Sequence, residues 1–165
     1  MDFQTVWEQA VGFHGCECPA LAIGARATAY VIETLGLTQE SARQVVCTAE
    51  SFSCAIDAIQ GVLGCTIGNG RLRVLSNRKL AFRFCDGATG RSLYLSLRTW
   101  QQARPGLTTK LLEMPIKDLF VIESLNEVPA KAPNCVLSSA CPIRNPEQPE
   151  KQRRTAYPRG YDRDW

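Results

Sequence analysis

The chain has 165 residues, of which 45% are hydrophobic and 21% are charged, and its formal net charge is +3. This length and composition suit one soluble domain that folds around a hydrophobic core without disulfide bonds. The weak positive charge lies largely toward the C-terminus and does not indicate nucleic-acid binding. No segment resembles a signal peptide or is apolar for long enough to cross a membrane. We therefore expect a cytoplasmic protein with reduced cysteines.

Two helices are predicted at the start of the chain. Residues 2–11 place apolar side chains on one face at helical spacing, and Gly12 follows them. Residues 19–35 carry a longer apolar stripe, which begins at Pro19 and is terminated by Gly36. The second helix is rich in small residues, which predicts the close approach of another element, within the chain or across an oligomer interface.

A strand and a third helix are predicted next. Residues 44–50 have the composition of a strand, with Cys47 as a buried core thiol. Ser53 is a suitable N-cap for a helix that ends near residue 63, so Cys54 is expected to be its first residue. The segment 64–70 holds three glycines, which predicts a tight loop that can approach a ligand.

The rest of the chain is predicted to be mostly β-structure. Alternating polar and apolar residues predict an antiparallel meander with one solvent-facing side. A helical segment at 107–119 is interrupted by Pro115. The three strands of the meander and the last strand are expected at residues 71–75, 79–84, 92–97 and 119–128.

Helices followed mainly by strands predict an α+β fold, with N-terminal helices packed on a mainly antiparallel sheet. We place this core domain at residues 1–128. From residue 129 onward prolines recur among charged residues, which is typical of an extended arm or a disordered tail.

The densest group of potential metal ligands surrounds the chain's single histidine. His14, Cys16 and Cys18 alternate, so an extended segment would place all three side chains on one side. They precede a predicted helix N-terminus, whose dipole favours a thiolate, the form that binds metal. The alternative is a loop histidine beside two inert thiols. The clustering favours a metal site.

Two further cysteines compete for the fourth ligand position. Cys54 and Cys65 are eleven residues apart, so a regular helix between them would separate them by about 16 Å. A single zinc ion in one chain cannot bind both. We expect Cys54, at a helix N-terminus, to complete a zinc site with His14, Cys16 and Cys18. Cys65 is then a reactive thiol at a cavity mouth, or a ligand shared across a homodimer.

The role of the site depends on how many ligands bind. Four protein ligands make a closed structural site, whereas three leave a position for water or substrate. Asp57, one turn into the third helix, is expected to orient His14, to act as a base, or simply to interact with the helix dipole. Glu50 and Thr66 are weaker candidates for the site.

Four ordered motifs make the chain resemble the FmdE family of formylmethanofuran dehydrogenase proteins. They are FHGCECP at residues 13–19, Glu50 after a strand, CAIDAIQ at 54–60 and GCTIG at 64–68, and KLAF at 79–82 also matches. The resemblance covers about residues 3–128.

Two departures from the family pattern bear on the metal. Cys16 stands where members of this family carry a second histidine, and the added sulfur favours zinc or another soft metal. The C-terminal zinc ribbon of many members looks absent, because no paired cysteine follows Cys141.

The resemblance implies a zinc-binding accessory to a molybdenum or tungsten enzyme of the formylmethanofuran or formate dehydrogenase type. One alternative is a stand-alone enzyme that uses a metal-bound water or a thiolate on a small molecule, with Cys65 and Asp57 as catalytic groups. Another is a metal- or sulfur-handling protein.

Overall fold

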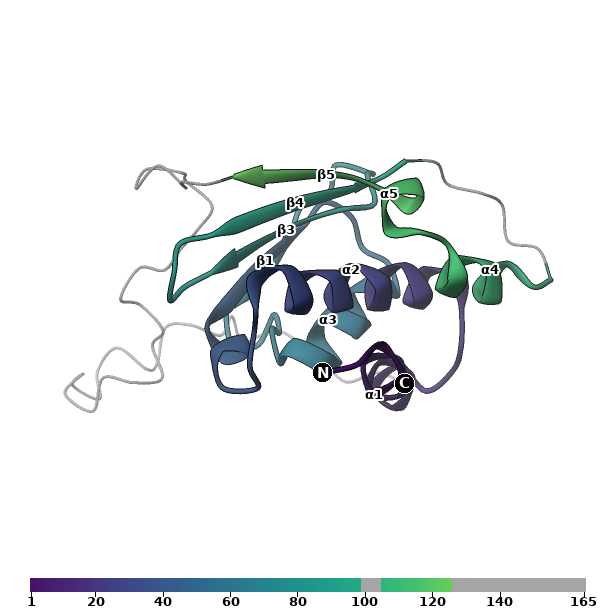
Figure 1. The fold of residues 1–165 in the computed structure, drawn as a ribbon, viewed down its shortest axis with the longest axis horizontal. Coiled ribbons are helices and arrows are strands. Elements are labelled where there is room, and N and C mark those ends of the chain that lie inside the picture. Colours follow the sequence, from purple (N-terminus) through teal and green to yellow (C-terminus); the bar gives the residue numbers. More distant parts are fainter. Residues whose placement is uncertain (99–104, 126–165) are drawn as a thin grey trace, which may run out of the picture.

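A computed structural model of the protein describes residues 1–98 and 105–125 and confirms the α+β fold. Helices pack on one face of a five-stranded sheet (Figure 1). The helices are α1 (Phe3–His14), α2 (Pro19–Leu35), the 3-10 turn η1 (Ser41–Gln44), α3 (Ala55–Leu63), α4 (Leu107–Glu113) and α5 (Ile116–Leu119). The strands are β1 (Val45–Ala49), β2 (Leu72–Val74), β3 (Ala81–Asp86), β4 (Ser92–Leu97) and β5 (Phe120–Leu125). The predicted tail at 129–165 lies outside the described residues.

The ends of the first two helices follow from local signals. Asp2 caps α1, accepting a hydrogen bond from the backbone N–H of Thr5. The helix runs through Gly12 to His14, because Gly15 is the residue that adopts the left-handed conformation, at φ 91°. Helix α1 is therefore longer than predicted, and this extension makes His14 its last residue.

The sheet order is β2-β1-β3-β4-β5, and it corrects the predicted meander at its first step. Strand β2 does not pair with β3. It pairs in parallel with β1, which in turn pairs antiparallel with β3. Strand β1, helix α3 and strand β2 thus form a parallel crossover unit. Alternation of side chains identifies a strand but does not specify its neighbour, and only strands β3, β4 and β5 form the expected meander.

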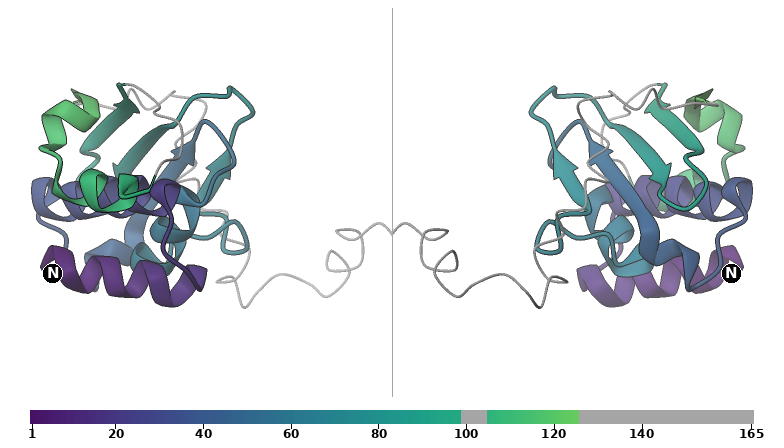
Figure 2. Two further views of the ribbon diagram at one scale, coloured as in Figure 1. Left: turned by 90° about the vertical axis from the view of Figure 1, so that its right-hand side faces the viewer. Right: turned by 90° about the vertical axis from the view of Figure 1, so that its left-hand side faces the viewer.

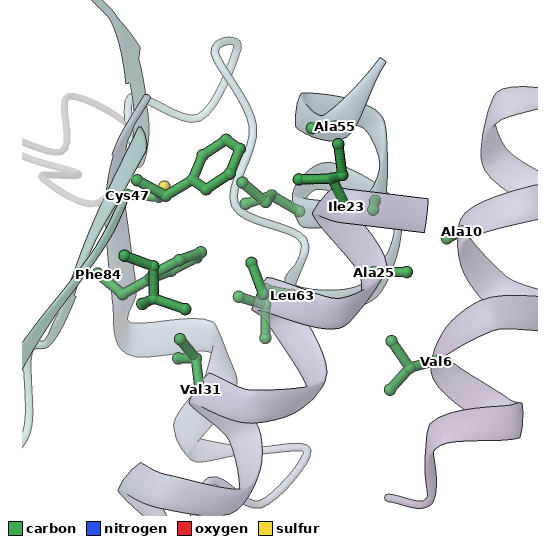
Figure 3. Close-up of a cluster of buried hydrophobic side chains, with 14 of the residues drawn as sticks. Val6, Ala10, Ile23, Ala25, Val31, Cys47, Ala55, Leu63 and Phe84 are labelled. Atoms are coloured by element: carbon green, nitrogen blue, oxygen red, sulfur yellow. The ribbon is translucent and has the colours of Figure 1, made fainter. Parts of the chain in front are cut away.

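Helix α2 is the central layer of the domain. It lies between the sheet and α1, as the two edge-on views show (Figure 2). Val6 and Ala10 of α1 face it from one side, and Cys47 and Phe84 of the sheet face it from the other (Figure 3). Cys47 is completely buried, as predicted. Being covered on both sides explains why α2 is apolar around most of its circumference.

The small residues of α2 allow α3 to pack very closely against it. A Cβ atom added to Gly24 would lie only 2.2 Å from the backbone oxygen of Ala55. The composition of the helix therefore serves a contact within the chain. No helix in the described part of the chain is long and apolar enough to cross a membrane.

Candidate metal centre

Three helix ends meet at one point of the surface. His14 is the last residue of α1, Cys18 is the N-cap of α2, and Cys54 is the N-cap of α3. One ligand atom from each of these side chains lies within 4.8 Å of the other two. All three side chains are partly buried. The donor set of one imidazole and two thiols is the type that zinc prefers.

The spacing of Cys18 and His14 suits a tetrahedral ion. Cys18 Sγ lies 3.7 Å from His14 Nε2. Bonds of about 2.3 Å to sulfur and about 2.0 Å to nitrogen would place these two atoms roughly 3.5 Å apart in a tetrahedral zinc site. Closing this small difference needs only side-chain adjustment. If these three side chains held one ion, a fourth tetrahedral position would remain for another ligand.

Asp57 contacts the imidazole of His14 through Nδ1, the ring nitrogen that does not face Cys18. Its Oδ2 lies 2.7 Å from His14 Nδ1, and the two side chains are 33% and 16% exposed. With the proton on Nδ1 donated to this carboxylate, the lone pair of Nε2 points toward Cys18. A carboxylate behind a metal-binding histidine holds the required tautomer and makes the ring a stronger ligand. Of the roles considered for Asp57, the geometry supports orientation of His14.

The two thiols already interact with each other and with nearby backbone. Cys18 Sγ accepts a hydrogen bond from the N–H of Leu21 at 3.3 Å, as an N-cap side chain does. Partial burial raises the pKa of Cys54, and its contact with Cys18 and the charge of Asp57 raise this pKa further. Two thiolates and a carboxylate repel one another without a cation, so a bound metal ion would stabilise the ionised form.

The start of α3 differs slightly from the prediction. Cys54 has helical backbone angles, φ −57° and ψ −17°, but the helix proper begins at Ala55. Ser53, the predicted N-cap, has a buried hydroxyl oxygen with no hydrogen-bond partner among the described residues. Cys54 still projects from the N-terminus of α3, as the sequence predicts.

The structure does not bring Cys16 or Cys65 into this group. Cys16 is exposed on the loop between α1 and α2. Cys65 is completely buried, and its thiol donates to the backbone oxygen of Arg71 at 2.8 Å. Burial raises the pKa of Cys65 to about 11, although the positive charge of Arg71 opposes this rise. In this environment Cys65 is a neutral core thiol rather than one that faces a substrate.

The weaker candidates, Glu50 and Thr66, also lie outside the three-residue group. Glu50 accepts a hydrogen bond from the hydroxyl of Tyr94 at 3.0 Å. Thr66 accepts one from the backbone N–H of Asn69 at 3.1 Å within the loop 64–70. Both residues are accounted for by these local contacts.

Sequence reasoning gave no role to Gln60, although it touches the site. Its side-chain amide donates to Asp57 Oδ1 at 3.2 Å. The contact could have been predicted from the three-residue spacing of Asp57 and Gln60, because residues three apart on a helix are neighbours on its surface.

A groove of about 620 Å³ lies elsewhere on the molecule. Its lining includes Gln9, Arg43 and Val62, but none of the three ligand residues.

The sequence and the fold of this chain are similar to those of known proteins. Residues 13–121 match the family described as "FmdE, Molybdenum formylmethanofuran dehydrogenase operon". A curated protein of Archaeoglobus fulgidus, named "Probable S-adenosyl-L-methionine-binding protein", is 32% identical over 77 residues. That match covers 44% of this chain and only 21% of the curated protein.

A solved structure shows the same fold. It is that of a tungsten formylmethanofuran dehydrogenase FmdE-like protein from Syntrophus aciditrophicus, with a TM-score of 0.59 and 22% sequence identity. The similarity covers 78% of this chain and 74% of the other.

Proposed function

This chain belongs to the FmdE family, and on that basis we propose that it is a zinc-binding accessory protein of a molybdenum or tungsten formylmethanofuran or formate dehydrogenase-type system. The family's link to a molybdenum formylmethanofuran dehydrogenase operon supports the choice of partner. The convergence of one imidazole and two thiols within 4.8 Å supports the metal site.

In this proposal His14, Cys18 and Cys54 hold the zinc ion and the fourth position stays open. Asp57 fixes the histidine tautomer through the 2.7 Å contact with Nδ1. The Leu21 N–H supports the Cys18 sulfur. When bound, the ion would supply Lewis-acid chemistry at the open position.

A homodimer is also part of the proposal. Phe13 and Phe52 are 53% and 71% exposed and lie close to ligand residues in the sequence. Exposed aromatic side chains beside a functional site are typical of surfaces that become buried on association. Light scattering after gel filtration would show a dimer for the wild type and a shift toward monomer for Phe52→Ser.

The second candidate is a stand-alone enzyme that acts on a small molecule at the open position. The observation in its favour is the three-ligand set, which catalytic zinc sites share. The two candidates differ in what they require. An accessory protein needs its dehydrogenase, whereas a stand-alone enzyme acts by itself.

Metal analysis tests the proposed site. Protein purified without chelators is expected to carry about one zinc per chain, and Cys18→Ser and Cys54→Ser are expected to lose it. Cys16→Ser is the matched control and should keep it, because Cys16 lies outside the group. Zinc content unchanged in both Cys18→Ser and Cys54→Ser would overturn the site. Loss of zinc in Cys16→Ser would show that Cys16 is a fourth ligand and that the site is closed.

The accessory role needs a separate experiment in the source cells. Deleting the gene should lower the activity of the associated dehydrogenase, and the wild-type gene should restore it while Cys54→Ser does not. Full dehydrogenase activity in the deletion strain would overturn the accessory role without affecting the metal site.

A further inference from the structure

The loop 64–70 and the metal centre share one side chain, that of Gln60. Its amide nitrogen donates to Asp57 Oδ1 at 3.2 Å, and its amide oxygen accepts from the backbone N–H of Ile67 at 3.5 Å. A continuous set of contacts therefore runs from Ile67 through Gln60 and Asp57 to His14.

The amide of Gln60 offers both the donor and the acceptor that these two contacts require. A carboxylate such as Asp57 requires a donor, and a backbone N–H requires an acceptor. Glutamate would offer no donor, and lysine would offer no acceptor. Gln60 is half-buried on α3, one turn beyond Asp57, so its reach matches both partners.

The loop that Gln60 contacts is internally braced. Thr66 and Asn69 exchange hydrogen bonds, each accepting from the other's backbone N–H at 3.1 Å. The Asn69 side chain also donates to the backbone oxygen of Gly64 at 2.7 Å. Ile67, at the exposed part of this loop, is 56% exposed. These hydrogen bonds constrain the loop, so the backbone N–H of Ile67 is held in a defined position beside Gln60.

We propose that Gln60 is a positioning residue that couples the loop 64–70 to the metal centre by holding Asp57, and through Asp57 the ring of His14. The inference rests on the proposed function for the presence of the metal. The hydrogen bonds that it uses are formed in the structure without a metal ion. Coupling is reciprocal, so metal at the centre also changes how firmly the loop is held.

The chain's single histidine makes a direct test available. Protein labelled with ¹⁵N only in histidine gives signals from His14 alone. In the metal-free wild type at a pH where the ring is neutral, we expect the proton mainly on Nδ1, because Asp57 accepts it there. Gln60→Met has a similar length without polar groups, and it should increase the fraction protonated on Nε2. Gln4→Met is the matched control, because Gln4 also donates to a carboxylate, that of Glu8, but on the exposed face of α1.

A double-mutant cycle identifies the route of the effect. Asp57→Ala should move the proton to Nε2, and adding Gln60→Met to that variant should change nothing further if Gln60 acts through Asp57. For zinc affinity we expect a loss of about 3- to 10-fold in Gln60→Met, less than the 10- to 100-fold typical of removing a histidine's direct partner. Amide exchange at Ile67 should be faster in Gln60→Met than in either the wild type or Gln4→Met.

The outcomes separate this inference from the proposed function. Wild-type tautomer populations in Gln60→Met would overturn the positioning role. An additional shift on adding Gln60→Met to Asp57→Ala would also overturn it, because the effect would not pass through Asp57. A wild-type protein that binds no zinc but shows the expected tautomer response would refute the zinc site and support the role of Gln60.

Discussion

Gly24 of α2 and Ala55 of α3 pack backbone to backbone, and a Cβ on Gly24 would approach the carbonyl oxygen of Ala55 to 2.2 Å. Ala55 directly follows Cys54, and α2 begins directly after Cys18. The contact that joins the two helices thus also sets how closely the two thiols approach each other. Core packing and the candidate metal centre depend on the same pair of residues.

Gly24→Ala is expected to destabilise the fold and weaken metal binding. The added methyl group meets rigid backbone, so the helices must separate, and overpacking of this kind costs about 1–3 kcal/mol. Urea denaturation measures the loss of stability, and competition with a chelator measures the loss of zinc affinity. Gly12→Ala is the control, because nothing lies within 4 Å of its added Cβ, and it should stabilise α1 by about 0.5–1 kcal/mol. A Gly24→Ala protein as stable as wild type would contradict the packing argument.

Asp57→Asn is expected to lower zinc affinity by about 10-fold while preserving the fold. The amide keeps the shape of the carboxylate but loses the charge that the His14 Nδ1–H donates to at 2.7 Å. Chelator competition gives the affinity, and circular dichroism verifies the fold. Asp118→Asn serves as the control, since Asp118 also lies in a helical first turn, that of α5. Equal affinities for both variants would show that Asp57 does not support the metal ligand.

The cysteines of the described residues should differ sharply in alkylation. Cys16 is exposed and should react at once with or without metal, whereas the buried Cys47, Cys65 and Cys85 should stay unmodified in the native protein. Cys18 and Cys54 should react after zinc is removed and be protected when zinc is restored. Mass spectrometry of digested protein locates the modified residues. Protection of Cys16 by zinc would instead place it among the ligands.

Cys65 should make the fold sensitive to alkaline pH. Its pKa is raised from 9.0 to about 11, so the unfolded chain loses this proton first. The contribution of the protonated Cys65 thiol to the free energy of unfolding is therefore fully present below pH 9.0 and is lost as the pH rises toward about 11. A shift of this size corresponds to roughly 3 kcal/mol. Cys65→Ser keeps a donor for the oxygen of Arg71 but does not titrate, so its stability should fall less over this pH range in urea denaturation. Parallel pH dependence of the two proteins would refute this role of Cys65.

The sequence was most informative where structure depends on neighbouring residues. The bounds of α2 were predicted as observed, because Pro19 and Gly36 are local signals for the start and end of a helix. The separation of α4 from α5 at Pro115 was also predicted, because proline in the interior of a helix interrupts it. The α+β class followed from the order of such elements along the chain.

The sequence also located the parts of the candidate metal centre but not their final arrangement. It predicted His14, Cys16, Cys18 and Cys54 as ligands, and the structure brings His14, Cys18 and Cys54 together. Orientation of His14 was one of the roles predicted for Asp57. The alternation of His14, Cys16 and Cys18 assumed an extended segment, whereas His14 ends a helix and Cys16 lies exposed in the following loop. Spacing alone could not distinguish Cys16 from Cys18.

The remaining features were decided by contacts between residues far apart in the chain. Asp57 reaches His14 across 43 positions because α1 and α3 pack side by side, and β2 pairs with β1 because α3 crosses between them. Burial placed Cys65 in the core although its loop is rich in glycine. Local sequence specifies each helix and strand through backbone preferences, whereas the partners of these elements are selected by packing of the whole core, which only the tertiary structure shows.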